Sequence, residues 1–175
     1  MSNLLITGPP RCGKTTLIKK ISQDVSLSNK VGGFITEELR EKGERVGFKI
    51  TSLPDNKEGI LARKDFSSPY RVGSYGVNTK DLENIGCSAI SEALYSEKII
   101  LVDEIGKMEL FSKIFKNILA HALDSPQKML ATIMEQRNEF VDRIKNRKDA
   151  KLVHLSRNNF NNVFTEILNW LKMPL

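Results

Sequence analysis

A glycine-rich stretch followed by Lys-Thr lies near the start of the chain, with the spacing G-x-x-x-x-G-K-T over residues 8–15. It directly follows an apolar segment, residues 3–7, which we expect to form a buried strand, and it precedes an amphipathic helical pattern. Glycines in this context let successive backbone N–H groups point at one spot, to which the helix adds its positive end. Lys14 can then reach the β- and γ-phosphates of a nucleotide, and the Thr15 hydroxyl can bind Mg²⁺. The stretch therefore predicts a phosphate-binding loop for a nucleoside triphosphate.

Two carboxylates, Asp103 and Glu104, directly follow the apolar run at residues 99–102. In phosphate-loop enzymes a carboxylate at such a strand end holds Mg²⁺, usually through water, so Asp103 is the expected metal ligand beside Thr15. A second acid next to it can take a proton from an attacking water, which makes Glu104 the candidate base. Taken alone, the pair is also compatible with a solvated strand end. Together with the phosphate loop, it favours a hydrolase of the ATPase type over a GTP-dependent switch.

Two segments are therefore expected to contact the nucleotide, and Lys14 and Glu104 are the predicted catalytic residues. Thr15 and Asp103 are the predicted metal ligands. Thr132, at the end of the next predicted strand, either orients the attacking water or is present for its β-propensity. The predicted nucleotide-binding residues are Gly8, Pro9, Pro10, Arg11, Cys12, Gly13, Lys14, Thr15 and Thr16 in the loop, and Leu101, Val102, Asp103, Glu104, Ile105 and Gly106 at the acidic strand.

The pattern of apolar residues predicts an α/β fold: a phosphate-loop NTPase with a mostly parallel, doubly wound sheet and helices on both faces. Near residues 31–62 the pattern changes to an antiparallel hairpin extension, with a turn expected at 41–44. Residues 63–78 are expected to form a loop. Strands are expected at 3–7, 31–37, 45–51, 59–62, 98–102, 127–133 and 151–155, and helices after the phosphate loop and at 79–97, 109–123, 140–147 and 163–171, with Phe111, Phe115 and Leu119 in the core.

Composition narrows the class of protein. The 175 residues suffice for one domain over 1–175, and 40% hydrophobic with 27% charged residues is ordinary for a globular protein. No apolar run approaches the roughly 20 residues of a membrane span, no signal segment precedes the first strand, and Cys12 and Cys87 form no disulfide framework. We therefore expect a cytoplasmic protein. The net charge of +6 suits an anionic ligand.

Five segments share residues with one known family: Gly8–Thr16, Gly33–Glu38 with Arg40, Arg45–Phe48, Gly73–Asn78 and Asp103–Glu109. Over nearly the whole chain they resemble the THEP1-type nucleoside-triphosphatases. The resemblance implies slow, Mg²⁺-dependent hydrolysis of several nucleoside triphosphates to the diphosphate and phosphate, on a fold related to nucleotide kinases and RecA-like ATPases. The chain departs from the family at Arg11, where glycine is common, and at Phe160, where arginine is common.

No residue pattern predicts a specific reader of the base, so ATP, GTP, CTP and UTP are all expected substrates. Residues 146–149 faintly resemble the guanine-reading motif of GTPases but continue a helical pattern. The basic stretch 137–157 is compatible with nucleic acid, although a solvated helix face is favoured. Arginine fingers could come from Arg40, Arg45, Arg63, Arg71, Arg137 or Arg143.

Two other functions remain open from the sequence. One is a nucleotide or nucleoside kinase, whose acceptor would lie between the hairpin and residues 63–78. The other is a nucleotide-regulated module that binds nucleic acid. Phosphate release in the absence of an acceptor separates hydrolysis from the first, and binding to nucleic acid at physiological salt tests the second.

Overall fold

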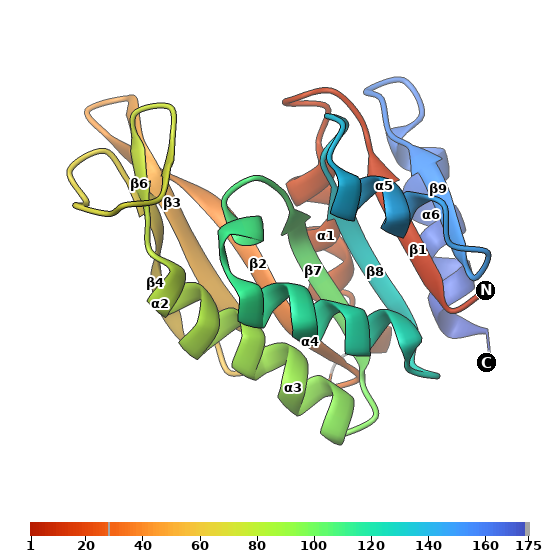
Figure 1. Cartoon of the computed structure of the whole chain (residues 1–175). Coiled ribbons are helices and arrows are strands. Elements are labelled where there is room, and N and C mark those ends of the chain that lie inside the picture. Colours follow the sequence, from red (N-terminus) through yellow and green to blue (C-terminus); the bar gives the residue numbers. More distant parts are fainter. Residues whose placement is uncertain (28, 174–175) are drawn as a thin grey trace.

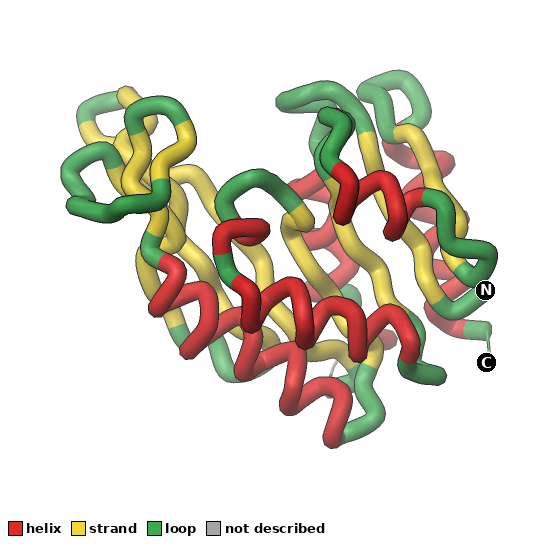
Figure 2. Tube along the Cα trace, in the orientation of Figure 1, coloured by secondary structure: helices red, strands yellow, loops and turns green. Residues whose placement is uncertain are grey.

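The computed structural model describes residues 1–27 and 29–173 of the chain. Its described residues form a mixed sheet of nine strands in the order β5-β6-β4-β3-β2-β7-β8-β1-β9 (Figures 1 and 2). The parallel part comprises β1 (Asn3–Thr7), β7 (Ile99–Ile105), β8 (Met129–Ile133) and β9 (Ala150–His154). The strands predicted at residues 3–7, 98–102, 127–133 and 151–155 are therefore present, and so is the predicted parallel sheet.

The antiparallel part begins with β2 (Val31–Glu41), whose first four residues pair in parallel with β7 and whose remainder forms a hairpin with β3 (Glu44–Leu53). β4 (Glu58–Arg63) continues this extension. Beyond it, residues 63–78 contain a small hairpin of β5 (Arg71–Val72) and β6 (Tyr75–Val77). The expectation of a loop there is wrong, because strands this short carry no readable alternation of apolar and polar residues.

Helices cover both faces of the sheet, as expected for a doubly wound fold (Figure 1). On one face lie α3 (Ser88–Tyr95), α4 (Lys113–Asp124) and α5 (Glu139–Lys145), whose buried side chains join one core cluster. On the other face α1 (Lys14–Ser22) packs beside α6 (Phe160–Lys172) in a second cluster. Short 3-10 turns occupy Val25–Leu27 and Glu109–Phe111. No helix of the described residues is long and apolar enough to cross a membrane.

Two predicted helices differ from the structure. The segment 79–97 is divided into α2 (Thr79–Asp81), a π-helical stretch (Leu82–Cys87) and α3, a change of winding that apolar periodicity does not reveal. The helix expected from residue 109 begins at residue 113 instead, because the Ser112 side chain accepts a hydrogen bond from the Phe115 N–H and caps it. Phe111 therefore lies before the helix and is 37% exposed, whereas Phe115 and Leu119 are fully buried.

Gly33 fixes the contact between the two parts of the sheet. It pairs with Leu53 of β3 and with Leu101 of β7, and its φ is +110°. A Cβ at this position would lie 2.0 Å from the Leu101 carbonyl oxygen. Only glycine allows β2 to approach β7 so closely while it turns into the hairpin.

We expect Gly33→Ala to lower the free energy of unfolding by about 1–3 kcal/mol more than Gly43→Ala. Both glycines have positive φ, but a Cβ on Gly43 meets nothing within 4 Å. The strain of the left-handed backbone, about 1–2 kcal/mol, is common to both variants, and only Gly33→Ala adds an overlap with backbone. Urea denaturation of the two variants measures the difference, and equal losses would contradict this explanation.

Candidate functional site

The phosphate loop joins the end of β1 to the start of α1, at the carboxyl edge of the parallel strands. Gly13 precedes the helix with φ +107°, and Arg11 is exposed with φ +63°. The Lys14 ammonium donates hydrogen bonds to the carbonyl oxygens of Gly8 at 2.7 Å and Pro9 at 3.2 Å. The loop thus curls around its own lysine, and the first N–H groups of α1 lie at the same edge.

Phe160, the first residue of α6, lies against this loop. A Cβ on Gly13 would lie 3.1 Å from one carbon of the Phe160 ring. The ammonium of Lys20 lies 5.5 Å from the centre of the same ring. The residue that departs from the family pattern therefore places a partly buried aromatic surface beside the start of α1.

Asp103 lies on β7 with no exposed surface and is surrounded by hydroxyl groups. The Thr132 hydroxyl donates to its Oδ1 at 2.6 Å, and the Thr36 hydroxyl donates to its Oδ2 at 3.3 Å. Burial raises the pKa of Asp103, while hydrogen bonds from Thr132, Thr15 and Thr36 lower it. The acidic strand and the phosphate loop are thus in contact through Thr15 and Asp103, the two predicted metal ligands.

Glu104 and Glu109 lie close together beside Asp103. A Cβ on Gly106 would lie 2.8 Å from Glu104 Oε1 and 3.0 Å from Glu109 Oε2, and the Gly106 N–H donates to Glu109 Oε2 at 3.2 Å. Burial, with the Asp103 charge, raises the pKa of Glu104, and Lys14 opposes this rise. Burial and then the Glu104 charge raise the pKa of Glu109 to about 8. The site therefore holds a cluster of carboxyl groups with raised proton affinity.

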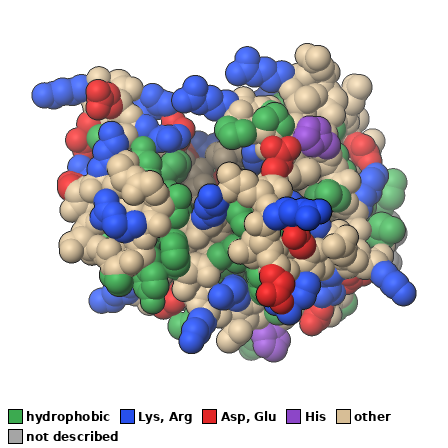
Figure 3. Space-filling model, turned by 45° about the horizontal axis from the view of Figure 1, so that its top comes forward, with side chains coloured by type: hydrophobic (Ala, Val, Ile, Leu, Met, Phe, Trp, Pro, Cys, Tyr) green, Lys and Arg blue, Asp and Glu red, His purple; other side chains and the backbone are tan. Residues whose placement is uncertain are grey.

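A cavity of about 820 Å³ joins these groups. The space-filling view shows the molecule hollowed on this side, with Lys and Arg side chains around the hollow (Figure 3). One end is lined by the phosphate loop and the other by the hairpin extension, with Glu104 contributing as well. Loop residues that line the cavity are Gly8, Pro10, Arg11, Gly13, Lys14, Thr15 and Thr16.

Some predicted contact residues lie elsewhere. Leu101, Val102 and Ile105 are fully buried in the two core clusters, so their side chains do not line the cavity. Cys12 is also buried, behind the loop with its Sγ close to Gly8. The apolar run of β7 instead serves to position Asp103 and Glu104 at the carboxyl end of the parallel strands.

Among the arginines considered as fingers, only Arg45 lines the cavity. Arg40 is paired with Glu38, Arg63 with Glu41 and Asp65, and Arg143 with Glu139. Arg71 donates to the Ser74 carbonyl. Arg137 is exposed.

Thr36 and Glu109 are functional candidates that the sequence analysis did not single out individually. Both fall in segments that resemble the THEP1-type proteins, and this resemblance is the sequence feature that could have identified them. Thr132 contacts the predicted metal ligand, because its hydroxyl donates to Asp103 Oδ1.

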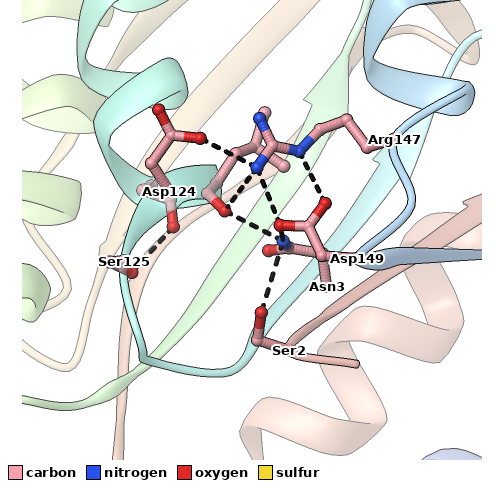
Figure 4. Close-up of polar contacts among 8 residues, drawn as sticks. Ser2, Asn3, Asp124, Ser125, Arg147 and Asp149 are labelled. Atoms are coloured by element: carbon pink, nitrogen blue, oxygen red, sulfur yellow. Dashed lines mark hydrogen bonds and ion pairs between the residues drawn. The ribbon is translucent and has the colours of Figure 1, made fainter.

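Residues 146–149 lie beside Asn3, at the start of β1, whereas the phosphate loop follows the other end of this strand (Figure 4 shows the contacts around Asn3). Arg147 pairs with Asp124 and Asp149, and the buried Asn3 at the start of β1 donates to Asp149 Oδ2 at 3.2 Å. Its contacts join the start of β1, the end of α4 and the residue before β9. The cluster therefore cannot contact the base of a nucleotide bound at the phosphate loop. Elsewhere in the basic stretch, Lys151 pairs with Glu166.

The oxygens of Thr15 and Asp103 fit a Mg²⁺ ion. Magnesium takes hard oxygen ligands and is usually held through one or two carboxylates together with substrate phosphates. In the described part of the chain, no group of three or more His, Cys, Asp or Glu side chains is arranged to hold a metal. A hydroxyl directly after a phosphate loop, in contact with a buried carboxyl, matches the pattern of a metal bound together with a nucleotide.

Comparison with known proteins agrees with this site. The sequence profile of the NTPase family matches residues 3–168. The chain is 50% identical over 169 residues to nucleoside-triphosphatase THEP1 of Thermotoga maritima, covering 97% of this chain and 95% of that protein. The chain belongs to the THEP1-type NTPase family. It is also 35% identical over 180 residues to the human cancer-related nucleoside-triphosphatase, covering 95% of this chain and 94% of that one.

A solved member of the family shows the same fold. The crystal structure of THEP1 from the hyperthermophile Aquifex aeolicus superposes with a TM-score of 0.89 at 36% identity, covering 98% of this chain and 99% of the other. The resemblance stated from the sequence is thereby confirmed, and with it the phosphate-loop α/β fold.

We expect Glu109→Gln to stabilise this NTPase increasingly as the pH rises from about 5 to 8. The folded protein holds the Glu109 proton up to a pKa of about 8, whereas the unfolded chain releases it near the ordinary 4.5. The wild type thus loses stability across this interval, by up to about 1.4 kcal/mol per pH unit, and the neutral amide does not. Thermal unfolding of both proteins at several pH values measures the gap.

The exposed Glu92→Gln is the matched control and should show no such trend. A gap between Glu109→Gln and wild type that is constant with pH would mean that Glu109 ionises equally in both states.

Proposed function

We propose that this protein hydrolyses nucleoside triphosphates to the diphosphate and phosphate with Mg²⁺. The observation that carries the proposal is the convergence of Lys14, Thr15 and Glu104 at one end of a single cavity, with Asp103 buried next to them and hydrogen-bonded to Thr15. The relatives named nucleoside-triphosphatases support it over almost the full length of the chain. We further propose one cytoplasmic domain over residues 1–175 and slow turnover, as the family resemblance implies.

Each residue has a distinct role in this proposal. Lys14 exchanges its carbonyl partners for the β- and γ-phosphates and offsets their charge. Thr15 and Asp103 hold Mg²⁺, which supplies charge neutralisation on the phosphates. Glu104 accepts the proton of the attacking water, and its raised pKa makes it a better acceptor.

The base is proposed to be held without specific hydrogen bonds. Phe160 offers an aromatic surface beside Gly13, and stacking accepts any ring. Discrimination between bases requires buried polar groups that the wrong base leaves unpaired. The segment 146–149, with its resemblance to the guanine motif, contacts the start of β1, whereas the phosphate loop follows the end of that strand, so it does not provide such groups.

We expect Glu104→Gln to separate binding from hydrolysis. The amide keeps the shape of the side chain but cannot accept a proton, so phosphate release should fall by roughly 10²–10⁴-fold. Nucleotide affinity should change little, because Lys14 and the loop remain. Lys14→Ala is the comparison variant and should weaken both. Phosphate release and binding of a fluorescent ATP analogue measure the two effects, and turnover near the wild-type rate in Glu104→Gln would place the base elsewhere.

We expect ATP, GTP, CTP and UTP to be hydrolysed with kcat/KM values within about tenfold of one another, or roughly 1.4 kcal/mol. The strong contacts are made to phosphate and Mg²⁺, which all four share. Parallel assays at equal Mg²⁺ test this. A preference of about a thousandfold for one base would show that a specific reader exists, and residues 156–160 are the segment in which to seek it.

A further inference from the structure

The cavity extends from the phosphate loop to the hairpin extension. Its total volume of about 820 Å³ is near the upper end of the roughly 300–1,000 Å³ found for small-ligand pockets. The residues proposed for hydrolysis lie at the loop end. The rest of the lining comes from the hairpin extension and from the segment that follows β7, and its main residues are Arg45, Phe48, Leu61 and Val72 on the first and Lys107 and Met108 on the second; we refer to this part as the hairpin end.

Apolar side chains make up much of this hairpin end. Phe48 of β3 is half-buried and contacts Tyr75 edge to face, with 5.4 Å between the ring centres. Val72 of β5 and Met108, which follows β7, are also half-buried beside the cavity. Side chains held in this way by three separate segments form a wall suited to a planar ring.

Positive charge accompanies this apolar wall. The Arg45 guanidinium lies 5.2 Å from the centre of the Phe48 ring, and it shares the Glu38 carboxylate with Arg40. One carboxylate between two guanidiniums leaves this group with net positive charge. Lys107 is exposed and has no ion pair within residues 1–27 and 29–173.

The acids that line the cavity do not cancel this charge. Glu37 is paired with Lys19 and Lys49. Glu104 lies near Lys14, and Glu109 keeps its proton at neutral pH because burial and the Glu104 charge raise its pKa to about 8. Glu38 is the carboxylate already shared by Arg40 and Arg45. Glu135 follows β8, the strand beside β1, and so belongs to the loop end. The hairpin end therefore combines an apolar wall with cations that can pair with an anionic group.

We propose that the hairpin end of the cavity binds a second small molecule that combines a planar ring with an anionic group, while a triphosphate occupies the loop. Nucleoside monophosphates have this combination and serve as probes. The inference rests on the proposed function only in placing the triphosphate at the loop end.

The experiment is a calorimetric titration in two steps. The first titrates β,γ-imido-ATP with Mg²⁺ into the protein and tests occupancy of the loop by itself. The second titrates AMP, GMP, CMP and UMP into the protein saturated with the analogue. At least one monophosphate is expected to bind, one per chain. The matching nucleoside and inorganic phosphate, which each carry half of the chemistry, are expected to bind at least tenfold more weakly.

Variants locate the second site. Lys107→Met and Phe48→Ala are each expected to weaken the monophosphate at least tenfold while the affinity for the analogue changes less than threefold. Lys107 is a surface residue, so its variant keeps the test valid if Phe48→Ala fails to fold. Lys57→Met and Tyr95→Ala are matched controls on exposed residues outside the cavity and should leave both affinities unchanged.

Three results would overturn the proposal: no monophosphate binding at millimolar concentration, binding that displaces the analogue, or binding indifferent to both cavity variants. Failure of the analogue to bind in the first step would instead overturn the proposed function.

Discussion

The buried carboxyl group of Asp103 is the constraint around which the site is arranged. A carboxylate with no exposed surface is costly unless hydrogen bonds or opposite charge compensate it. Here the compensation comes from hydroxyl groups on neighbouring segments: Thr132 on β8, Thr36 on β2, and Thr15 at the start of α1. Because the strand order places β7 between β2 and β8, and β8 beside β1, one side chain ties together the elements that surround the phosphate-loop end of the cavity.

This arrangement also concentrates carboxyl groups with raised pKa values at the end of β7. Burial raises the pKa of each of Asp103, Glu104 and Glu109. The Asp103 charge further raises the pKa of Glu104, and the Glu104 charge further raises that of Glu109. Lys14 is the cation whose charge counteracts the rise at Glu104. The proposed Mg²⁺ and the lysine thus act on the same excess of negative charge that the fold concentrates at the end of β7. A site of this kind gains most from cations where substrate phosphates bring further negative charge.

The sequence was sufficient to predict the features that depend on local patterns. The strand, loop and helix over residues 3–22 follow from apolar periodicity and from the glycine and lysine spacing, and the pair at Asp103 and Glu104 follows from the end of an apolar run. The partners of Asp103 were not predictable in this way. Thr36 and Thr132 are brought to it by the order of strands in the sheet, and a threonine in a strand carries no sign of what its hydroxyl will meet.

The same distinction explains the errors in the fold. Phe111 matches the helical stripe of Phe115 and Leu119, but Ser112 caps the helix and leaves Phe111 outside it, where its ring lies 5.1 Å from that of Tyr70. The contact lies between a 3-10 turn and the loop before β5, segments some forty residues apart. Periodicity measures one element at a time, so contacts between loops fall outside its reach.

The wall of the cavity opposite the phosphate loop follows from the length of β2. This strand pairs with β7 from Val31 only as far as Phe34. It then continues to Glu41, an overhang of roughly 20 Å at about 3.3 Å per residue. A bare overhanging edge would invite pairing with another chain, and charged side chains discourage it. Glu37, Glu38 and Arg40 occupy this part of β2, and their ion pairs reach α1 and β3. The charges that protect the edge therefore also set the charge of the cavity, and through Glu38 they hold Arg45 against Phe48.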